Sequence, residues 1–499
     1  MALYVNFYVE YELMVFSSLI FLYGFFSLSL LAYSLCNTQK AQNIVLLVFS
    51  LIFYAWGEPK YVFLLMFMAL TSWLCALGVD KAESQSRKKL WVAAAAIIDI
   101  GLIGYFKYAS LIVGVFGDVP DFIRNIALPI GISFYTFQLL TYVIDVYRGE
   151  APAQKSYWNV LLYAALFHQC IAGPIVRYKT IDEELFGRRR RKPEWSAGVT
   201  RFTAGLAKKV LLANPCGALA ESLLLSDSAI ADISQLAANI ATLEKLPVMS
   251  AWLGLAAYSM HIYLDFSAYS DMAIGMGRMI GLHYLENFNF PYISRTVTEF
   301  WRRWHMSLGT FFRDYVYIPL GGSRCSKPRM VLNTFVVWAL TGLWHGASWN
   351  FVVWGLWFFV FLMIERFLLK GWFEKIPVVS NVYLIVVVML GWVVFRFTNM
   401  ELAWTAVKSL FGANGNAFTS FTTGIQFKSN MFVLAASFIA CTPLVRVLGS
   451  KLADFCHGHG VLGKVWDVAF YSVLPVILLL LSTACLVGDS YNPFIYFQF

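Results

Sequence analysis

The stretch "MVLNTFVVWALTGLWHGASWNFVVWGLWFFVFLMI" (330–364) contains one histidine, His345, and no formally charged residue. Two apolar runs, 330–340 and 351–364, flank the segment "TGLWHGASWN" (341–350) that carries this histidine. A membrane-crossing helix needs about 20 predominantly apolar residues. Both runs have the apolar composition of helices that lie in lipid. The stretch therefore predicts membrane helices with a titratable imidazole among tryptophans.

The composition of the whole chain indicates an integral membrane protein. Apolar residues make up 59% of the 499 residues and charged residues 13%, whereas about 25% of a soluble chain is charged. No soluble domain of ordinary size fits between the apolar runs, so we expect one polytopic, all-α membrane unit. A soluble, nucleic-acid-binding or purely structural role is excluded. The net charge of +9 fits basic cytoplasmic loops.

Apolar runs predict where the chain meets the membrane. The first run, 13–35, is too long for a signal-peptide core and has no basic residue before it, so we expect a retained helix. Further runs cover 41–56, 60–79, 90–116, 125–147, 157–176, 198–224, 248–282, 331–368, 380–397, 430–448 and 467–488.

Clusters of basic residues predict the orientation. The loops "DKAESQSRKK" (80–89) and "GRRRRK" (187–192) should be cytoplasmic, which places the N-terminus outside. A full crossing by 157–176 would put the second loop on the wrong side, and this segment contains Gly173-Pro174, which interrupts helical hydrogen bonding. We therefore expect 157–176 to enter the membrane and return, with its broken backbone buried in protein or lining a cavity.

The region 283–330 combines many basic residues with many aromatic ones. Short helices at the membrane interface fit this mixture. A helix over 298–312 would place on one face, and turn towards protein, the residues Trp301, Trp304, His305, Leu308 and Phe312. The spacing leaves open whether His305 is functional or is a structural histidine in a packed interface.

His345 is the stronger candidate for chemistry. On a helix it would share a face with Trp338, Thr341, Ser348 and Trp349. An ionisable group inside an apolar span is costly and is a functional candidate by default. Burial favours the neutral imidazole, which can take a proton from a hydroxyl that attacks an activated carbonyl. A structural histidine bonded to a neighbouring carbonyl is the alternative.

Other chemical motifs are weak. The chain has no GxSxG and no Walker A loop, and its eight cysteines form no CxxC pair. The segment "CHGHG" (456–460) is best interpreted as a flexible loop, and we expect no metal site. Four carboxylates lie in apolar surroundings, and for the two in "HIYLDFSAYSDMAIGMGRMIG" (261–281) we favour a bracing role over a functional one; the four are Asp99, Asp145, Asp265 and Asp271.

Two long motifs resemble a known family. "NFNFPYISRTVTEFWRRWHMSLGTFFRDYVYIPLGG" (287–322), followed by "TGLWHGASWNFVVWG" (341–355), is similar to the membrane-bound O-acyltransferase (MBOAT) superfamily, above all to its bacterial alginate O-acetyltransferase branch. "MVFSSLIFL" (14–22), "FSAYSDMAIGMGRMIG" (266–281) and "NPFIYFQF" (492–499) resemble the same branch. The resemblance thus extends over essentially the whole chain.

This resemblance implies a fold of roughly eleven transmembrane helices, with re-entrant and interfacial helices, around a central tunnel. It implies a single integral membrane domain over 1–499, with N-terminal helices in 1–150, a catalytic core with both histidines in 151–370, and C-terminal helices with an extracellular tail in 371–499. The expected location is the cytoplasmic membrane of a bacterium, so membrane lipids are expected partners.

The resemblance also implies an activity. An acetyl group would pass from a cytoplasmic thioester, acetyl-CoA, to an extracytoplasmic polysaccharide, with no bound cofactor. The family histidine of the "WHG" motif falls on His345, as the general base, and that of "WRRWH" on His305, which would orient the thioester or polarise its carbonyl. The expected donor-binding residues are Arg302, Arg303, Arg313, Trp304, Trp344 and Asn350. The three arginines could attract the donor phosphates or anchor the interface to lipid headgroups.

Near the end of the chain, Tyr496 lies among aromatic residues, on the outer side by the span count. In related acyltransfer systems a C-terminal tyrosine carries the acyl group to an extracellular SGNH-type partner, and Tyr496 is the candidate for that role. An interfacial aromatic anchor is the alternative.

Two rival functions stay open. A D-alanyl transferase for teichoic acid would draw on a carrier-protein thioester, but the extended C-terminal region favours the acetyltransferase branch. A proton-coupled transporter would use His345 as a relay, although no inverted repeat is visible. The acceptor could be an alginate-like exopolysaccharide, peptidoglycan or another surface glycan.

Overall fold

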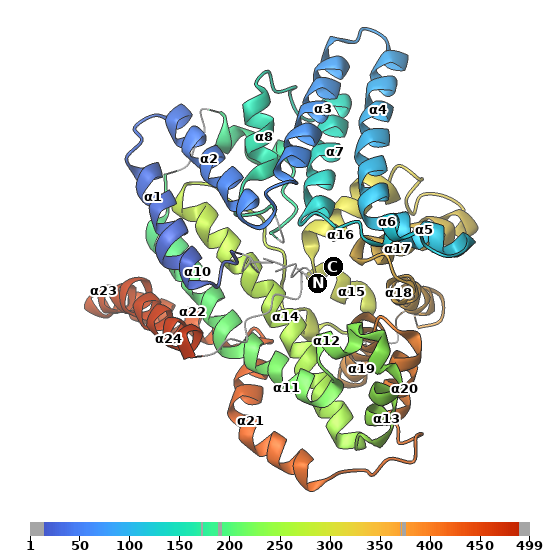
Figure 1. The fold of residues 1–499 in the computed structure, drawn as a ribbon. Helices are drawn as coiled ribbons and strands as arrows, with labels where there is room; N and C mark the ends of the chain where they lie inside the picture. Colours follow the sequence, from blue (N-terminus) through green and yellow to red (C-terminus); the bar gives the residue numbers. More distant parts are fainter. Residues whose placement is uncertain (1–13, 171–172, 188–191, 370, 372–375, 489–499) are drawn as a thin grey trace, which may run out of the picture. The chain divides into compact units, whose positions relative to one another are not determined.

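The computed structural model describes residues 14–170, 173–187, 192–369, 371 and 376–488, and over these residues it contains helices and no strand (Figure 1). The predicted all-α class is therefore confirmed. The chain divides into two compact units, residues 1–106 with 126–191 and residues 107–125 with 192–499. The organisation as a single domain stays a prediction.

The first unit is built around α3, which packs against α4, α7 and α8. Residues of α3 at helical spacing are buried, among them Leu65, Met68, Ala69 and Ser72, so one face of this apolar helix forms the centre of the unit. Its helices are η1 (Ile20–Phe26), α1 (Ser27–Ser34), α2 (Gln39–Gly57), α3 (Val62–Lys81), α4 (Gln85–Ile103), α7 (Ile132–Arg148), α8 (Tyr157–Ala165) and α9 (Tyr178–Leu185).

The interrupted segment at 157–176 is broken earlier than its proline suggests. Helix α8 ends at Ala165, and the described residues from there to Arg177 form no helix. Both Phe167 and Gln169 are buried, and the Tyr163 hydroxyl donates to the Val176 carbonyl at 2.8 Å. The predicted burial of the broken backbone is confirmed for its described residues. The return to the same side of the membrane stays a prediction.

The second unit holds the remaining helices. The π-helix η2 (Gly104–Tyr108) leads into it along the chain, and α14 packs against α10, α11 and α19. Its helices are α5 (Ala109–Phe116), α6 (Asp121–Arg124), α10 (Trp195–Ala207), η3 (Lys208–Ala213), α11 (Asn214–Leu224), α12 (Asp227–Ala231), η4 (Ile233–Gln235), α13 (Leu236–Lys245), α14 (Val248–Met279), η5 (Pro291–Ile293), α15 (Val297–Arg303), α16 (Met306–Phe312), η6 (Arg313–Tyr317), α17 (Lys327–His345), α18 (Trp349–Phe367), α19 (Pro377–Arg396), α20 (Met400–Leu410), α21 (Phe421–Ala440), α22 (Leu444–His457), α23 (Val461–Val468), η7 (Ala469–Val473) and α24 (Leu474–Gly488).

The two carboxylates of α14 bind cations of the preceding helices. Asp265 lies 2.7 Å from the Lys209 ammonium, and both side chains are buried. Asp271 lies 2.6 Å from the Arg201 guanidinium and also pairs with Lys208. These pairs fit the predicted bracing role, because a buried charge needs an opposite charge close by.

Six helical segments among the described residues are long and apolar enough to cross a membrane: 39–57, 62–81, 85–116, 349–367, 377–396 and 461–488. A seventh is possible if α21 and α22, bent by 67° at their junction, count as one span. This junction corrects the continuous run predicted over 430–448, since the helix stops at Ala440 and restarts at Leu444. The expected number of roughly eleven spans stays a prediction.

Candidate active site

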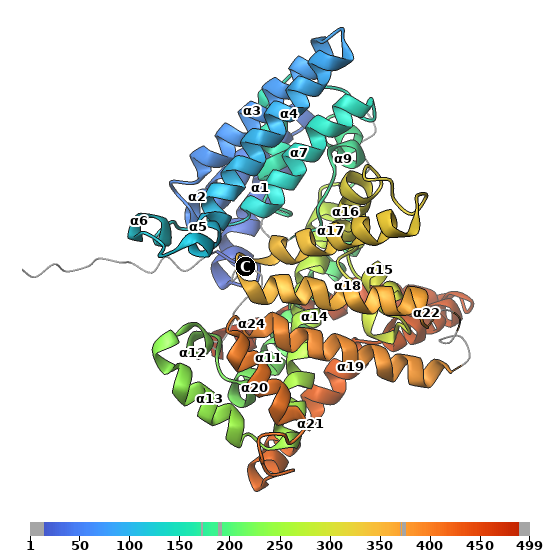
Figure 2. The same cartoon turned by 90° about the vertical axis from the view of Figure 1, so that its right-hand side faces the viewer.

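Helices α17 and α18 form a hairpin whose turn is "GAS" (346–348) (Figure 2). Two glycines permit the close approach of the helices: a Cβ at Gly342 would overlap the Phe351 carbonyl, and a Cβ at Gly355 would overlap the Trp338 carbonyl. Small residues at such a crossing let two apolar helices pack backbone to backbone. The hairpin therefore places His345 at the last position of α17.

Aromatic rings surround the His345 imidazole. Its ring centroid lies 4.9 Å from that of Trp354, 5.1 Å from that of Phe395 and 4.9 Å from that of Trp344. The side chain is 5% exposed, and its Nδ1 has no hydrogen-bond partner within the part of the chain that the structure describes. The prediction of a buried imidazole among tryptophans is confirmed. The predicted shared face with Ser348 and Trp349 is wrong, because α17 ends at His345.

The carbonyls at the end of α17 are capped by residues of η2 that the sequence analysis missed. The buried Lys107 Nζ donates to the Trp344 carbonyl at 2.6 Å and lies 3.5 Å from the His345 carbonyl oxygen. The Tyr108 hydroxyl donates to the Leu343 carbonyl at 2.7 Å. The last carbonyls of a helix lack intrahelical partners, so these side chains fix the end that carries His345. The sequence did offer a signal for a role of Lys107, because it is the lone lysine in the apolar run 90–116.

His305 lies at a break between two short helices. The prediction of one helix over 298–312 is wrong, because α15 ends at Arg303, His305 has φ 44° and ψ 55°, and α16 begins at Met306. The short helices expected in 283–330 are nevertheless present. At this break the His305 ring packs against Phe266 at 4.8 Å between centroids and against Trp344 at 5.7 Å. Burial lowers the pKa of the His305 imidazole to about 3, so the ring is neutral at ordinary pH.

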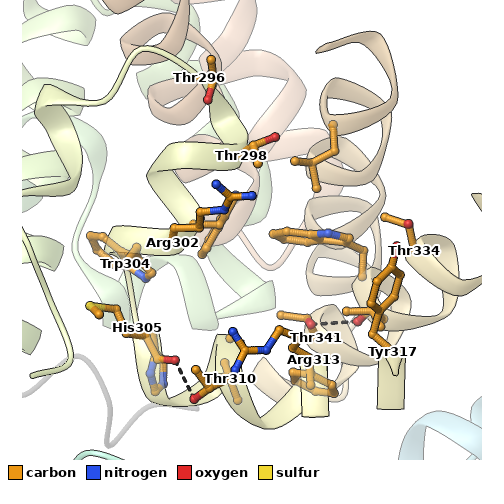
Figure 3. A pocket seen from close by; sticks show the side chains of 18 of the residues that line it. Thr296, Thr298, Arg302, Trp304, His305, Thr310, Arg313, Tyr317, Thr334 and Thr341 are labelled. Carbon is orange, nitrogen blue, oxygen red and sulfur yellow. Dashed lines mark hydrogen bonds between the residues drawn. The ribbon is translucent and has the colours of Figure 1, made fainter. Parts of the chain in front are cut away.

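Both histidines line one cavity of about 1140 Å³. Figure 3 shows His305 with other side chains of the cavity wall. Its wall combines aromatic side chains with hydroxyl groups and cations, and its principal lining residues are Thr296, Thr298, Trp301, Arg302, Trp304, His305, Thr310, Arg313, Tyr317, Thr334, Trp338, Thr341, His345, Glu365 and Arg366. A typical small-molecule site has about 300–1,000 Å³, so this one has room for a large ligand.

The cavity contains three arginines and one carboxylate. Both oxygens of the buried Glu365 are used by the N-terminus of α15: one accepts from the Val297 amide, and the other accepts from the amide and the hydroxyl of Thr298 at 3.1 and 3.0 Å. Negative charge stabilises a helix N-terminus. Glu365 thus positions α15, a role that no sequence motif predicted.

The predicted donor-binding residues divide into two groups. Arg302, Arg313 and Trp304 line the cavity. Arg303 instead pairs with Glu299 at 2.9 Å, and the Asn350 amide donates to the carbonyls of Val394 and Phe395. The Trp344 ring lies between the two histidines. Tyr496 lies outside the described residues.

Comparison with known proteins identifies the family of the chain. Residues 150–407 match the model of the MBOAT, membrane-bound O-acyltransferase family. The chain is 35% identical to the probable alginate O-acetylase AlgI of Pseudomonas putida and 36% identical to that of Azotobacter vinelandii, each over 97% of this chain and 100% of the relative. It is 28% identical to the peptidoglycan O-acetyltransferase of Helicobacter pylori over 81% of this chain and 80% of that protein. The chain therefore belongs to the membrane-bound O-acyltransferase family and is a multi-pass membrane O-acyltransferase.

Proposed function

We propose that this enzyme moves an acetyl group from cytoplasmic acetyl-CoA across a bacterial cytoplasmic membrane for O-acetylation of an extracytoplasmic polysaccharide. The observation that carries the proposal is that His305, His345 and three arginines line the same cavity. Full-length similarity to alginate O-acetylases supports the acetyl group and the polysaccharide class.

His345 acts as the general base in this proposal. The acceptor hydroxyl attacks the thioester carbonyl carbon while His345 takes its proton. A C–O bond forms, the C–S bond breaks, and the proton passes from His345 to the departing thiolate, so that an ester and a free thiol result. General-base assistance of this kind contributes about 10²–10⁴-fold to a rate. The aromatic rings around His345 exclude water that would hydrolyse the thioester.

The arginines bind the donor. Guanidinium groups suit phosphate because their donors match its oxygens in pairs. Arg302, Arg313 and Arg366 line the cavity, whereas the carboxylate of Glu365 is bonded within the fold. Arg313 also pairs with the neighbouring Asp314 at 2.7 Å, so Arg302 and Arg366 supply the positive charge that favours the phosphates of CoA.

The proposal keeps two further elements as the sequence predicted them. An SGNH-type extracellular protein receives the acetyl group, and Tyr496 carries it there. In the absence of that partner, the C-terminal peptide of the enzyme should gain an acetyl ester that mass spectrometry detects.

The test is an assay of purified protein in lipid nanodiscs with two donors, acetyl-CoA and a D-alanyl carrier-protein thioester. We expect thiol release and acetylation with acetyl-CoA, and a loss of about 10²–10⁴-fold for His345→Ala that matches the loss of a general base. The His305→Ala loss should be smaller.

The matched control is His457→Ala, since His457 lies on α22 beside Asp467, away from the cavity. Use of the D-alanyl donor alone would replace this proposal with teichoic acid D-alanylation. Unchanged transfer by correctly inserted His345→Ala protein would refute the general base.

A further inference from the structure

The side chain of Asn287 lies directly beside the His305 imidazole. His305 Nδ1 is 3.2 Å from Asn287 Oδ1, and Asn287 is completely buried. The same oxygen lies 3.1 Å from the Ser307 amide nitrogen and 2.9 Å from the Ser307 hydroxyl. One amide oxygen is therefore the common partner of three groups around the break between α15 and α16.

The Ser307 backbone determines which way the Asn287 amide faces. A side-chain amide can be turned so that oxygen and nitrogen exchange places, and its hydrogen-bond partners decide between the two orientations. A backbone N–H is only a donor, so the atom that faces the Ser307 amide must be an acceptor. That atom is the oxygen Oδ1.

The orientation of this amide in turn determines the tautomer of His305. A neutral imidazole has one N–H and one nitrogen with a lone pair. If Nδ1 carried the lone pair, it would face the lone pairs of Asn287 Oδ1 at 3.2 Å. The hydrogen bond exists only when Nδ1 carries the hydrogen. The Ser307 hydroxyl lies 3.4 Å from Nδ1 as well, but its own hydrogen is directed at Asn287 Oδ1 over the shorter 2.9 Å, so its oxygen faces Nδ1 as an acceptor. Nε2 is then the nitrogen with the lone pair, which makes it a hydrogen-bond acceptor.

The backbone around His305 holds the ring in this place. His305 has a left-handed conformation, which costs a residue other than glycine about 1–3 kcal/mol and persists only where its surroundings enforce it. The Met306 amide donates to the Asn287 carbonyl at 2.9 Å, and the Asn289 amide donates to the Arg303 carbonyl at 2.9 Å. Segment 287–289 thus binds both sides of the break.

We infer that Asn287 is a positioning residue that holds His305 in the Nδ1–H tautomer, so that Nε2 accepts a hydrogen bond from the bound acyl donor. The inference rests on the proposed function for the identity of that donor. It also decides between the two roles predicted for His305, since a neutral ring that accepts at Nε2 cannot polarise a carbonyl oxygen.

A group of the donor that binds Nε2 of this tautomer must supply an N–H or an O–H. The attacking hydroxyl has one proton, which His345 takes in the proposed reaction. The pantetheine arm of CoA carries amide N–H groups close to its thioester, and one of these fits Nε2. His305 then orients the thioester towards His345, which lies across the Trp344 ring.

Among the described residues, the other ionisable groups near His305 do not take the place of Asn287 as the hydrogen-bond partner of Nδ1. Besides His305, the charged or titratable residues that line the same cavity are His345, Arg302, Arg313, Tyr317, Glu365 and Arg366. On α14, Asp265 precedes Phe266, which packs on the His305 ring, and its carboxylate is paired with Lys209.

The tautomer can be measured directly by solid-state NMR of protein labelled with ¹³C and ¹⁵N at histidine. The chain has seven histidines, so subtraction of the spectrum of His305→Gln isolates the signals of His305. We expect the shifts of a neutral Nδ1–H ring. Asn287→Asp keeps the acceptor oxygen and should keep Nδ1–H, whereas Asn287→Ala should lose the preference for it.

The functional consequence is measured in the acetyl-CoA assay. Asn287→Ala should lower kcat/KM for acetyl-CoA by about 10- to 100-fold, as is usual when the partner that orients a histidine is removed, and Asn287→Asp should lower it less. The matched control is Asn289→Ala, since Asn289 is two residues away and its side chain is exposed. That variant should keep the activity of the unaltered protein.

An Nε2–H or doubly protonated His305 in the unaltered protein would overturn the inference. Equal losses for Asn287→Ala and Asn287→Asp, with Nδ1–H retained in both, would also overturn it. If the unaltered protein transfers no acetyl group while the NMR result stands, the proposed function has failed and the tautomer assignment has not.

Discussion

The buried amino group of Lys107 donates to a carbonyl that α17 cannot satisfy by itself, one residue before His345. It reaches two carbonyl oxygens, whereas the Tyr108 hydroxyl reaches one, and an intramolecular hydrogen bond contributes about 0.5–1.5 kcal/mol. The two capping residues of η2, Lys107 and Tyr108, therefore differ in how strongly they hold the end of the helix.

We predict that Lys107→Met lowers kcat about 10- to 100-fold, because 1.4 kcal/mol corresponds to a factor of ten and the end of α17 loses its strongest cap. Lys107→Arg should recover part of the rate. Tyr108→Phe is the matched control with the smaller loss. The measurement is acetyl-CoA-dependent thiol release, and equal rates for Lys107→Met and the unaltered protein would show that the cap does not matter for catalysis.

At the level of single residues, the sequence predicted His345 well and Asn287 not at all. A histidine inside an apolar run is conspicuous because burial of an ionisable group is costly. Asn287 acts through a contact with a residue 18 positions later, and such a contact has no periodic signal. It was nevertheless the first residue of the motif that resembled the family.

Among the helices, the hairpin of α17 and α18 depends on its glycines. A Cβ at Gly342 would overlap backbone atoms of α18, which cannot move without displacing the helix, whereas a Cβ at Gly101 in α4 would meet no atom within 4 Å. Overpacking of this kind costs about 1–3 kcal/mol, and alanine in an open helical position gains about 1 kcal/mol over glycine.

We therefore predict opposite effects of the same substitution. Gly342→Ala should lower the melting temperature and the fraction of monodisperse protein in fluorescence-detected size-exclusion chromatography. Gly101→Ala should leave both unchanged or raise them. A Gly342→Ala protein as stable as the unaltered one would mean that the two helices can separate without loss.

Helix positions followed hydropathy where the chain is apolar throughout. The runs 41–56 and 60–79 became α2 and α3, and 380–397 became α19. Periodicity failed over 298–312, because the tertiary contacts of Asn287 enforce a left-handed residue at His305 that the spacing of apolar residues does not encode. Hydropathy likewise missed the bend between α21 and α22, since both helices are apolar.

For the molecule as a whole, the basic loops predict its orientation in the membrane. The loop between α3 and α4 should face the cytoplasm, and so should Lys192, the last residue of the basic loop 187–192. We predict that Glu83→Cys and Lys192→Cys, each in a background without the eight native cysteines, react with an impermeant maleimide in inverted vesicles and not in intact cells. Both side chains are exposed in the structure. Labelling of the two positions from opposite sides would show that 157–176 crosses the membrane completely.

The carboxylate of Glu365 is bonded to the N-terminus of α15, and Asp314 pairs with Arg313, so Arg302 and Arg366 add positive charge to the cavity. In the proposed reaction the spent carrier, free CoA, keeps every phosphate that the acetylated carrier had. Binding that is equal before and after the chemical step does not speed turnover, so the cavity is prone to inhibition by its own product. Higher ionic strength weakens exposed charge pairs and would hasten release of the spent carrier. The turnover rate of the enzyme would then depend on the ratio of acetyl-CoA to free CoA in the cytoplasm.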